Sequence, residues 1–468
     1  MDSFHQFYDA IIVGSGISGS FIAADLTKAG LKCLLLEAGK FFNKYTYPHH
    51  EIDSNSQLYW GGGIEFNANA TIGFLRPKVV GGGSIVNQAL LDRFDNIALE
   101  AFRETSGVDF FSSENLKPWY EQAENELCIQ TIPEQFHNGN AKIFKTGFEK
   151  LGFQYAPLSR AQRDCRYEQG NDCIECLAGC PIDSKQSMPV TVLKKAFSEG
   201  LTLLDQCEVT KVAAGSRGNV EVHALFKNNE RHCFKGSRLI LASGAIGNSK
   251  LLLRSGFKKT LPALGENFFT HPQYMVLALY AKPINAHKGP LQSVKSNDPG
   301  FRRKGFKLEN VFAPPVAIAM LLPGIESHHQ YYMKNITRLA CIEVAVRDTH
   351  PGKIKLNRKG EIKIFKTLND EDKRRRNAGL ETIENIFEAT GAQEIIRGKM
   401  PIGLHLMGGC GIGSNAKTSV VNPDFQLHSH KNIFAADSSI FPNAPGINPS
   451  LTIMALSKLA ATKIVRNP

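Results

Sequence analysis

The hydrophobic pattern at the start of the chain predicts a strand, a helix and a second strand in close succession. Residues 9–13 form a short apolar run, as expected for a buried parallel strand. Apolar residues then recur at helical spacing from Ile17 to Ala29, and Gly30 follows as a candidate C-cap. A second apolar run, residues 32–36, ends at Glu37. This order predicts a βαβ unit of about thirty residues.

Three later stretches have the pattern of the same domain. Residues 207–213 read as a strand, residues 239–247 as a strand that runs into a glycine turn, and residues 432–461 as strand, turn and apolar helix. Pro449 is expected in the first turn of that last helix, where its missing N–H costs nothing.

Between residues 275 and 395 the pattern changes to that of an antiparallel sheet. Residues 354–356 and 362–364 alternate in polarity around a turn, which predicts a β-hairpin. Asn369 is placed to cap a helix that Gly391 closes.

The pattern as a whole predicts an α/β fold of two parts. A Rossmann-like nucleotide-binding domain with a parallel sheet, in a ββα sandwich, is expected over residues 1–274, with a cysteine-rich insert at about 165–180. An α+β substrate domain with an antiparallel sheet interrupts it over residues 275–395. Residues 396–468 are expected to return to the first domain and to supply catalytic groups.

The glycines after the first strand indicate dinucleotide binding. Gly14, Gly16 and Gly19 allow a tight turn, a close approach of backbone to a pyrophosphate, and close packing of helix on strand. Glu37, eighteen residues after Gly19, is placed to bind an adenosine ribose. The alternative is a glycine turn with a purely structural role. The loop at residues 80–87 is a second glycine-rich segment that can bring backbone amides to a ligand.

Composition is that of an ordinary soluble protein. The 468 residues are 42% apolar and 21% charged, with a net charge of +11. The basic residues are scattered except for the run at residues 373–376, which is interpreted as a solvated helix face rather than a nucleic-acid site. The longest apolar stretch, residues 311–325, is interrupted by prolines and too short to span a bilayer. No cleavable signal is visible, so a cytoplasmic protein without a transmembrane segment is expected.

The ten cysteines fall into two groups. Six are dispersed and are expected to be small buried apolar residues: Cys33, Cys128, Cys207, Cys233, Cys341 and Cys410. The other four are clustered: Cys165, Cys173, Cys176 and Cys180. Their spacing shares its second half with ferredoxin-type iron–sulfur runs. An iron–sulfur cluster, a zinc ion, and disulfides or free thiols all remain open interpretations.

Five segments together resemble the glucose–methanol–choline (GMC) flavoprotein oxidoreductases over the whole chain. They are the amino-terminal fingerprint ending at Gly39, the Gly82–Asn87 loop, residues 243–256, residues 264–272 with His271-Pro272, and a carboxy-terminal block from His405 to Asn448. The Gly-Gly-Cys after His405 and the Asn448-Pro449 pair look most like the cholesterol oxidase and long-chain alcohol branch, as does the segment from Arg347 to Gly352.

The resemblance implies a bound FAD. Its pyrophosphate would lie at Gly14, Gly16 and Gly19, and its adenosine at Glu37 and Val212. Asn87 would lie near the flavin ring and Asp437 near the ribityl-pyrophosphate, and further contacts are expected from Gly82, Gly83, Ser84, Ala242 and Asn448. Some members attach the flavin through a histidine at the position of Val86, so the FAD here is expected to be noncovalent.

The chemistry implied is oxidation of an alcohol to a carbonyl compound, with transfer of a hydride to flavin N5. An imidazole has a pKa near working pH, so His405 is assigned as the proton acceptor, and the Asn448 amide would orient the alkoxide. Glu343 is a candidate second carboxylate in the pocket, although an ordinary surface strand position is the favoured interpretation.

The expected substrate is a hydrophobic or sterol-like alcohol. One alternative is a sugar or polyol dehydrogenase that passes electrons through an iron–sulfur cluster to an acceptor protein or a quinone. Another is a redox-silent flavin-binding or electron-transfer subunit. A nicotinamide-dependent dehydrogenase is the least favoured.

Overall fold

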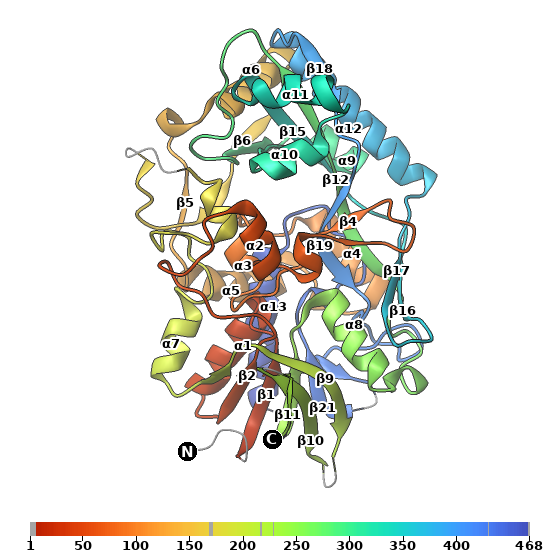
Figure 1. Cartoon of the computed structure of the whole chain (residues 1–468). Coiled ribbons are helices and arrows are strands. Elements are labelled where there is room, and N and C mark those ends of the chain that lie inside the picture. Colours follow the sequence, from red (N-terminus) through yellow and green to blue (C-terminus); the bar gives the residue numbers. More distant parts are fainter. Residues whose placement is uncertain (1–5, 168–171, 216–217, 228, 429, 467–468) are drawn as a thin grey trace.

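The computed structural model describes residues 6–167, 172–215, 218–227, 229–428 and 430–466. Two large sheets form opposite halves of the molecule, and both termini lie at the end built by the first sheet (Figure 1).

The first sheet has the parallel core predicted for a nucleotide-binding domain. Its strand order is β20 (Gln426–Leu427), β21 (His430–Ala435), β11 (Glu230–Leu241), β1 (Phe7–Val13), β2 (Cys33–Leu36) and β8 (Thr202–Leu204). The pairs from β21 to β8 are parallel. Two further strands extend this sheet. β10 (Val220–Phe226) pairs antiparallel with residues 230–236 of β11, and β9 (Cys207–Ala214) pairs antiparallel with β10. The predicted α/β class is confirmed.

Helices cover this sheet and bury its apolar residues. Helix α1 (Ile17–Lys28) packs on α13 (Ser450–Arg466) and α7 (Val192–Ser198), and α13 packs on α5 (Ser113–Asn125). Tyr8, Phe21 and Phe434 are fully buried in the resulting core. The two ends of the chain are therefore held together by apolar packing. Helix α13 begins at Ser450, so Pro449 lies directly before the helix rather than inside it.

The second sheet is mainly antiparallel. Its order is β3 (Glu65–Phe66), β4 (Gly73–Phe74), β19 (Ile402–Gly408), β12 (Phe268–Leu279), β15 (Leu339–Val346), β14 (Phe306–Asn310), β13 (Val294–Ser296) and β6 (Tyr155–Pro157), and β18 (Glu394–Arg397) also pairs with β12. Helices α6 (Gly139–Leu151) and α12 (Asp370–Ala389) pack on it.

The second sheet takes strands from both sides of residues 275–395. β3, β4 and β6 come from earlier in the chain, β18 spans the predicted boundary at residue 395, and β19 comes from the segment expected to return to the first domain. Of the described strands of that segment, β20 and β21 join the first sheet. The domain boundaries themselves remain a prediction.

The hairpin and the helix expected in this half are both present. β16 (Lys353–Leu356) pairs with β17 (Ile362–Phe365). The Asn369 side chain accepts a hydrogen bond of 2.8 Å from the Asp372 N–H at the start of α12, as an N-cap does.

Two of the six dispersed cysteines are not buried as expected. Cys233 is exposed and Cys128 is half-buried. On β11 the neighbouring Phe234 takes the buried side, so Cys233 faces the opposite side of the sheet. The basic run was expected on a solvated helix face. Three of its residues pair with acidic residues in the first turn of α12, but Arg375 also points toward the second sheet and donates to the Arg347 carbonyl at 2.7 Å. Among the described residues, no helix is long and apolar enough to cross a membrane.

Candidate active site

A cavity of about 850 Å³ lies between the two sheets and reaches both glycine loops. Most of the predicted site residues are on its wall: Gly14, Gly16, Glu37, Gly82, Gly83, Asn87, Ala242, His405, Asp437 and Asn448. Gly19, Ser84 and Val212 are not. Residues more than four hundred positions apart in the sequence therefore share one cavity.

The glycines of the first loop have different roles. A Cβ on Gly19 would come within 1.9 Å of the Gly14 carbonyl oxygen, and one on Gly14 within 2.4 Å of the Ala242 carbonyl oxygen. These two glycines let helix and strands approach closely. A Cβ on Gly16 would meet nothing within 4 Å, so this residue leaves open space in front of the α1 amino terminus. Free N–H groups at that end can bind a phosphate.

The second glycine loop lies directly on the first. Gly82 has a φ of +51°, and a Cβ there would be 2.8 Å from the Gly16 Cα. The Ser84 hydroxyl braces this loop from behind, because it donates to the Gly81 carbonyl at 2.7 Å and accepts from the Met188 N–H at 3.1 Å. Ser84 itself is not on the cavity wall, and its contact with a ligand remains a prediction.

Glu37 is held in place by three hydrogen bonds from the protein. Its carboxylate accepts from the Ser15 N–H at 2.9 Å, from the Ser15 hydroxyl at 2.8 Å and from the Gly39 N–H at 2.8 Å. Burial raises the pKa of this carboxyl group. A carboxylate has about four acceptor positions, so one remains for a ribose hydroxyl.

Asp437 ties the last strand of the sheet to the start of α8 (Gly244–Arg254). It accepts from the Gly244 N–H at 2.7 Å, the Asn248 amide at 2.9 Å and the Ser439 N–H at 2.9 Å. Asn248 also accepts from the Ser243 N–H at 2.9 Å. The role of Asn248 as a hub was not predicted from the sequence.

Val212 is not on the cavity wall, contrary to its expected contact with an adenine. Its side chain is fully buried in the core of the first sheet, and the part of β9 on the cavity wall is residues 207–210. The pairing of β9 with β10 is irregular at Thr210, which is paired with no residue of β10, and Val212 lies beyond this bulge, opposite the fully buried Val222.

At the other end of the cavity, Asn448 meets a buried carboxylate that was not predicted. Its amide donates to Glu309 Oε1 at 3.2 Å, and Glu309 also accepts from the Gln292 amide at 2.9 Å. Lys307 Nζ lies 2.5 Å from the same Oε1. The alternating residues of β14 could have indicated that Lys307 and Glu309 share one face.

Glu343 was expected on the surface, and this was wrong. It is 3% exposed, lies opposite Glu309 across the β14–β15 pair, and lines the cavity. Burial, and next the Glu309 carboxylate, raise the pKa of Glu343 well above its usual range. The raised pKa favours the protonated form of Glu343 beside the Glu309 carboxylate.

His405 faces a second histidine. Its Nδ1 lies 2.9 Å from Nδ1 of His271, whose Nε2 accepts from the Gly446 N–H at 2.9 Å. Burial, with the Lys307 ammonium nearby, lowers the pKa of His405 to about 3. Burial, together with the neighbouring positive charges, also lowers the pKa of His271. Both imidazoles are therefore neutral near pH 7.

Two family models described as GMC oxidoreductase match residues 8–273 and 348–457. The chain belongs to the GMC oxidoreductase family. It is 25% identical to a long-chain-alcohol oxidase of Arabidopsis thaliana over 98% of this chain and 67% of that protein. It is 22% identical to a cholesterol oxidase of Acinetobacter baumannii over 98% of this chain and 94% of that protein.

Solved structures share the fold. Pyridoxine 4-oxidase from Mesorbium loti superposes with a TM-score of 0.75 at 17% identity, covering 97% of this chain and 98% of that chain. An Aspergillus oryzae formate oxidase gives a TM-score of 0.76 at 14% identity, covering 99% of each chain. The chain is thus a GMC oxidoreductase in both sequence and architecture, an enzyme that acts on CH–OH donors.

Three of the clustered cysteines of this GMC oxidoreductase lie in a row behind the cavity wall. Cys176 is hydrogen-bonded to both Cys173 and Cys180, and these contacts lower the pKa of Cys173 to about 5 and of Cys180 to about 6. Cys165 contacts Tyr167, and the charge of Cys173 also acts on that tyrosine. No disulfide joins any of the cysteines among the described residues.

Two buried cations accompany these thiols. Arg160 is 3.7 Å from the Cys173 sulfur, and Lys185 donates to the Asn87 carbonyl at 2.9 Å and to the Cys176 carbonyl at 2.5 Å. Neither cation has a carboxylate partner among the residues described. The thiol row is thereby tied to the segment that carries Asn87.

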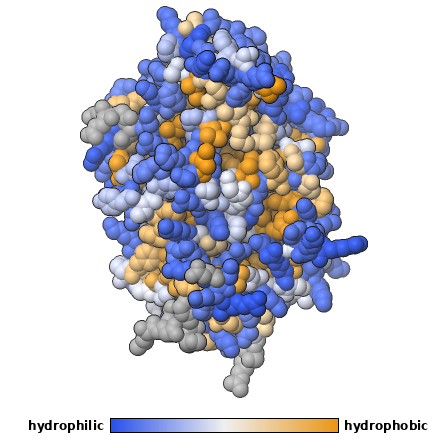
Figure 2. All heavy atoms as spheres, in the orientation of Figure 1, coloured by the Kyte–Doolittle hydropathy of each residue, from blue (hydrophilic) through white to orange (hydrophobic). Residues whose placement is uncertain are grey.

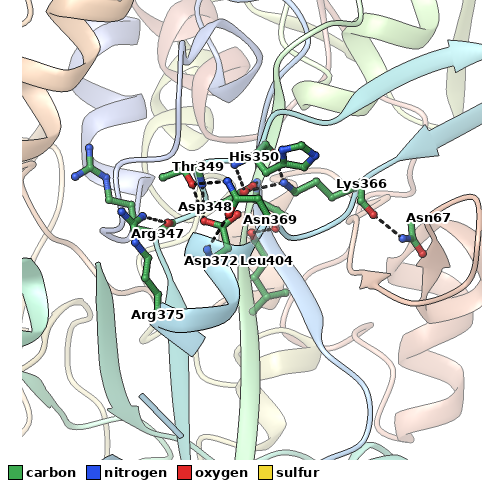
Figure 3. Close-up of polar contacts among 11 residues, drawn as sticks. Asn67, Arg347, Asp348, Thr349, His350, Lys366, Asn369, Asp372, Arg375 and Leu404 are labelled. Carbon is green, nitrogen blue, oxygen red and sulfur yellow. Dashed lines mark hydrogen bonds and ion pairs between the residues drawn. The ribbon is translucent and has the colours of Figure 1, made fainter. Parts of the chain in front are cut away.

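A buried ion pair between Lys366 and Asp348, drawn in Figure 3, contacts the strand that carries His271. Lys366 Nζ lies 2.6 Å from Asp348, and both side chains are fully buried. Asp348 also accepts from the Thr270 N–H at 3.1 Å, and the Thr270 hydroxyl donates to the Leu404 carbonyl at 2.6 Å. The pair thus braces the residues that directly precede His271 and His405.

Removing one partner of this ion pair should lower the stability of the folded protein. Lys366→Met would leave the Asp348 charge buried and uncompensated, so we expect the free energy of unfolding to fall by about 3–5 kcal/mol in urea titrations. The matched control is the double variant Lys366→Met with Asp348→Asn, which keeps an acceptor for Thr270 but no charge. It should recover most of the loss. A double variant as unstable as the single one would show that the charge is not the cause.

Proposed function

We propose that this chain binds FAD noncovalently and oxidises the CH–OH group of a hydrophobic alcohol to a carbonyl group. The observation that carries the proposal is the single cavity that joins the glycine loops to His405, Asn448 and Glu309. FAD, when bound, supplies the chemistry of a hydride acceptor. The formate oxidase that shares this fold carries FAD.

The walls of the cavity suit the parts of this cofactor. The open space at Gly16, before the α1 amino terminus, fits a pyrophosphate, and Glu37 has an acceptor position left for the adenosine ribose. Asn87 would lie beside the flavin ring and Asp437 near the ribityl-pyrophosphate. Val86, on the same wall, offers no nucleophile for a covalent link.

His405 and Asn448 would hold the hydroxyl oxygen of the substrate. Two groups on this wall are candidates to take its proton. One is the His405 imidazole, which the sequence analysis favoured. The other is the Glu309 carboxylate, which has Lys307 beside it and Glu343 opposite it on the neighbouring strand. In either case the O–H bond breaks toward the base and the C–H electron pair leaves as a hydride.

The substrate end of the cavity is apolar, which favours a hydrophobic alcohol. The segment from Val311 to Ala317 lines it, and so do Met320 and Leu321 of α10 (Pro315–Leu321). At the rim, Val316 and Met320 remain 39% and 51% exposed. Hydrophobic side chains also gather around the central hollow of this face (Figure 2). The long-chain-alcohol oxidases among the relatives fit this choice.

Anaerobic bleaching of the flavin is the direct test of the reaction. We expect long-chain primary alcohols or sterols to reduce the 450 nm band of the purified holoenzyme, and glucose to leave it unchanged. Bleaching by sugars alone would contradict the hydrophobic substrate. A flavin that none of these compounds reduces would instead favour the redox-silent flavin-binding subunit.

His405→Ala should slow this reduction by at least about 100-fold while FAD stays bound, since it removes a group that contacts the reacting oxygen. Stopped-flow reduction under anaerobic conditions measures the rate, and the ratio of flavin to protein absorbance checks retention. An unchanged rate would remove His405 from the reaction.

Gly16→Ala tests the cofactor site without disturbing the protein itself. Its added methyl group meets no protein atom but enters the space assigned to the pyrophosphate, so the Kd for FAD should rise by about tenfold or more. Gly411→Ala is the matched control, since a Cβ there is equally unhindered. Apoprotein stability should change little in either variant, and equal FAD affinity in the two would contradict the assignment.

A second candidate function is a dehydrogenase that passes electrons through an iron–sulfur cluster to an acceptor protein or a quinone. The observation in its favour is the pair of buried cations, Arg160 and Lys185, whose nearest anionic partners among the described residues are the thiols. The row of contacting thiols counts against it, because a cluster needs separated ligands. Iron, zinc and sulfide analysis of anaerobically purified protein distinguishes these cases.

A further inference from the structure

His271 has the most informative hydrogen bonds in the active site. It is 2% exposed and lies on β12, directly behind His405 as seen from the cavity wall. One ring nitrogen contacts the Gly446 backbone and the other contacts His405, each at 2.9 Å. These two contacts determine where every proton of the histidine pair must lie.

The donor and acceptor of each hydrogen bond follow from the Gly446 amide, because a backbone N–H can only donate. Nε2 of His271 must therefore carry a lone pair, and the neutral ring must hold its proton on Nδ1. That proton is donated to Nδ1 of His405. Since Nδ1 of His405 accepts, the proton of the neutral His405 ring must lie on Nε2.

The same bonds prevent His405 from gaining a second proton. A doubly protonated His405 would donate from Nδ1, and His271 would then have to accept at both ring nitrogens. Only an imidazolate accepts at both positions, and this ion does not form near neutral pH. While both hydrogen bonds persist, His405 is confined to one neutral tautomer. Its Nε2 has no protein partner among the described residues, and the ring lines the cavity.

We propose that His271 is a positioning residue that confines His405 to the Nε2–H tautomer, so that His405 donates a hydrogen bond to the substrate oxygen rather than taking its proton. The inference rests on the proposed function for the identity of that oxygen. With His405 as a donor, the hydroxyl proton passes to the Glu309 carboxylate, which is the other base on this wall.

The tautomer can be read directly in the holoenzyme labelled with ¹⁵N-histidine. Long-range ¹H–¹⁵N spectra should show His405 protonated at Nε2 and His271 at Nδ1, with the signals assigned by their loss in His405→Asn and His271→Asn. A proton on Nδ1 of His405 in the wild-type spectrum would overturn the proposal. This measurement needs no substrate and therefore stands apart from the proposed function.

Two nearly isosteric variants test the consequence for the rate. Asn at position 271 can still donate to Nδ1 of His405, whereas Asp can only accept there and forces the opposite tautomer. Both variants lose the Gly446 contact equally. We expect His271→Asp to reduce the flavin about 100-fold more slowly than His271→Asn, the size of effect seen when one donor to a reacting oxygen is lost.

The opposite order of rates would show that His405 acts as the base, because Asp would then activate its free Nε2. FAD content and thermal unfolding show whether the two variants bind the cofactor equally and are equally stable. If the Asp variant does not fold, the wild-type spectrum still decides the tautomer. A wild-type enzyme that no alcohol reduces would contradict the proposed function and leave the spectrum as the test of His271.

Discussion

The active site depends on an irregularity in the pairing of β12 with β19. Between Phe269 and His271 two steps along β12 correspond to three along β19, so β19 carries an extra residue. His405 lies at this bulge with a φ of +54°. Such a backbone conformation costs about 1–3 kcal/mol in a residue with a side chain. The Thr270–Leu404 hydrogen bond and the Asp348–Lys366 pair beneath it hold the strained segment. Without the bulge, strand alternation would not direct His405 toward both His271 and the cavity.

The cofactor half of the cavity follows from the geometry of the parallel sheet. β1, β11 and β21 run in the same direction, so their carboxyl ends reach the same edge. Gly14, Ala242 and Asp437 come directly or almost directly after these ends, and they gather there although they are far apart in the sequence. Ligands of open α/β sheets bind at this edge. The apolar contact between α1 and α13 then brings the loop that carries Asn448 close to the glycine loops.

Much of this half could be predicted because its signals are local. Gly14, Gly16, Glu37 and the flanking apolar runs are contiguous patterns, and each one corresponds to a feature of the structure. The predicted parallel sheet, the hairpin after Gly352 and the helix capped by Asn369 rest on equally local rules.

The substrate half was less accessible, since its contacts depend on how strands pair. His271 was noted as part of a motif but had no assigned partner, because its contact with His405 requires the register of β12 and β19. Glu309 was missed and Glu343 was misplaced on the surface, although the β14–β15 register makes them direct neighbours. Val212 shows the same limit in the first sheet. A strand can be predicted from its sequence without knowing which of its faces lines a cavity.

The positive charges around His271 and His405 affect both the histidines and the substrate oxygen beside them. Lys307, Arg302 and Arg347 all lie close enough to disfavour a positive charge on His271, and Lys307 has the same effect on His405. Burial is the larger cause of the lowered histidine pKa values and disfavours a charge of either sign, but the neighbouring cations also favour negative charge on an oxygen at the same place. The developing alkoxide of an alcohol is such an oxygen. Burial and the neighbouring cations thus make the histidines poor proton acceptors, and the cations also make the cavity wall beside them suited to stabilise the deprotonated substrate.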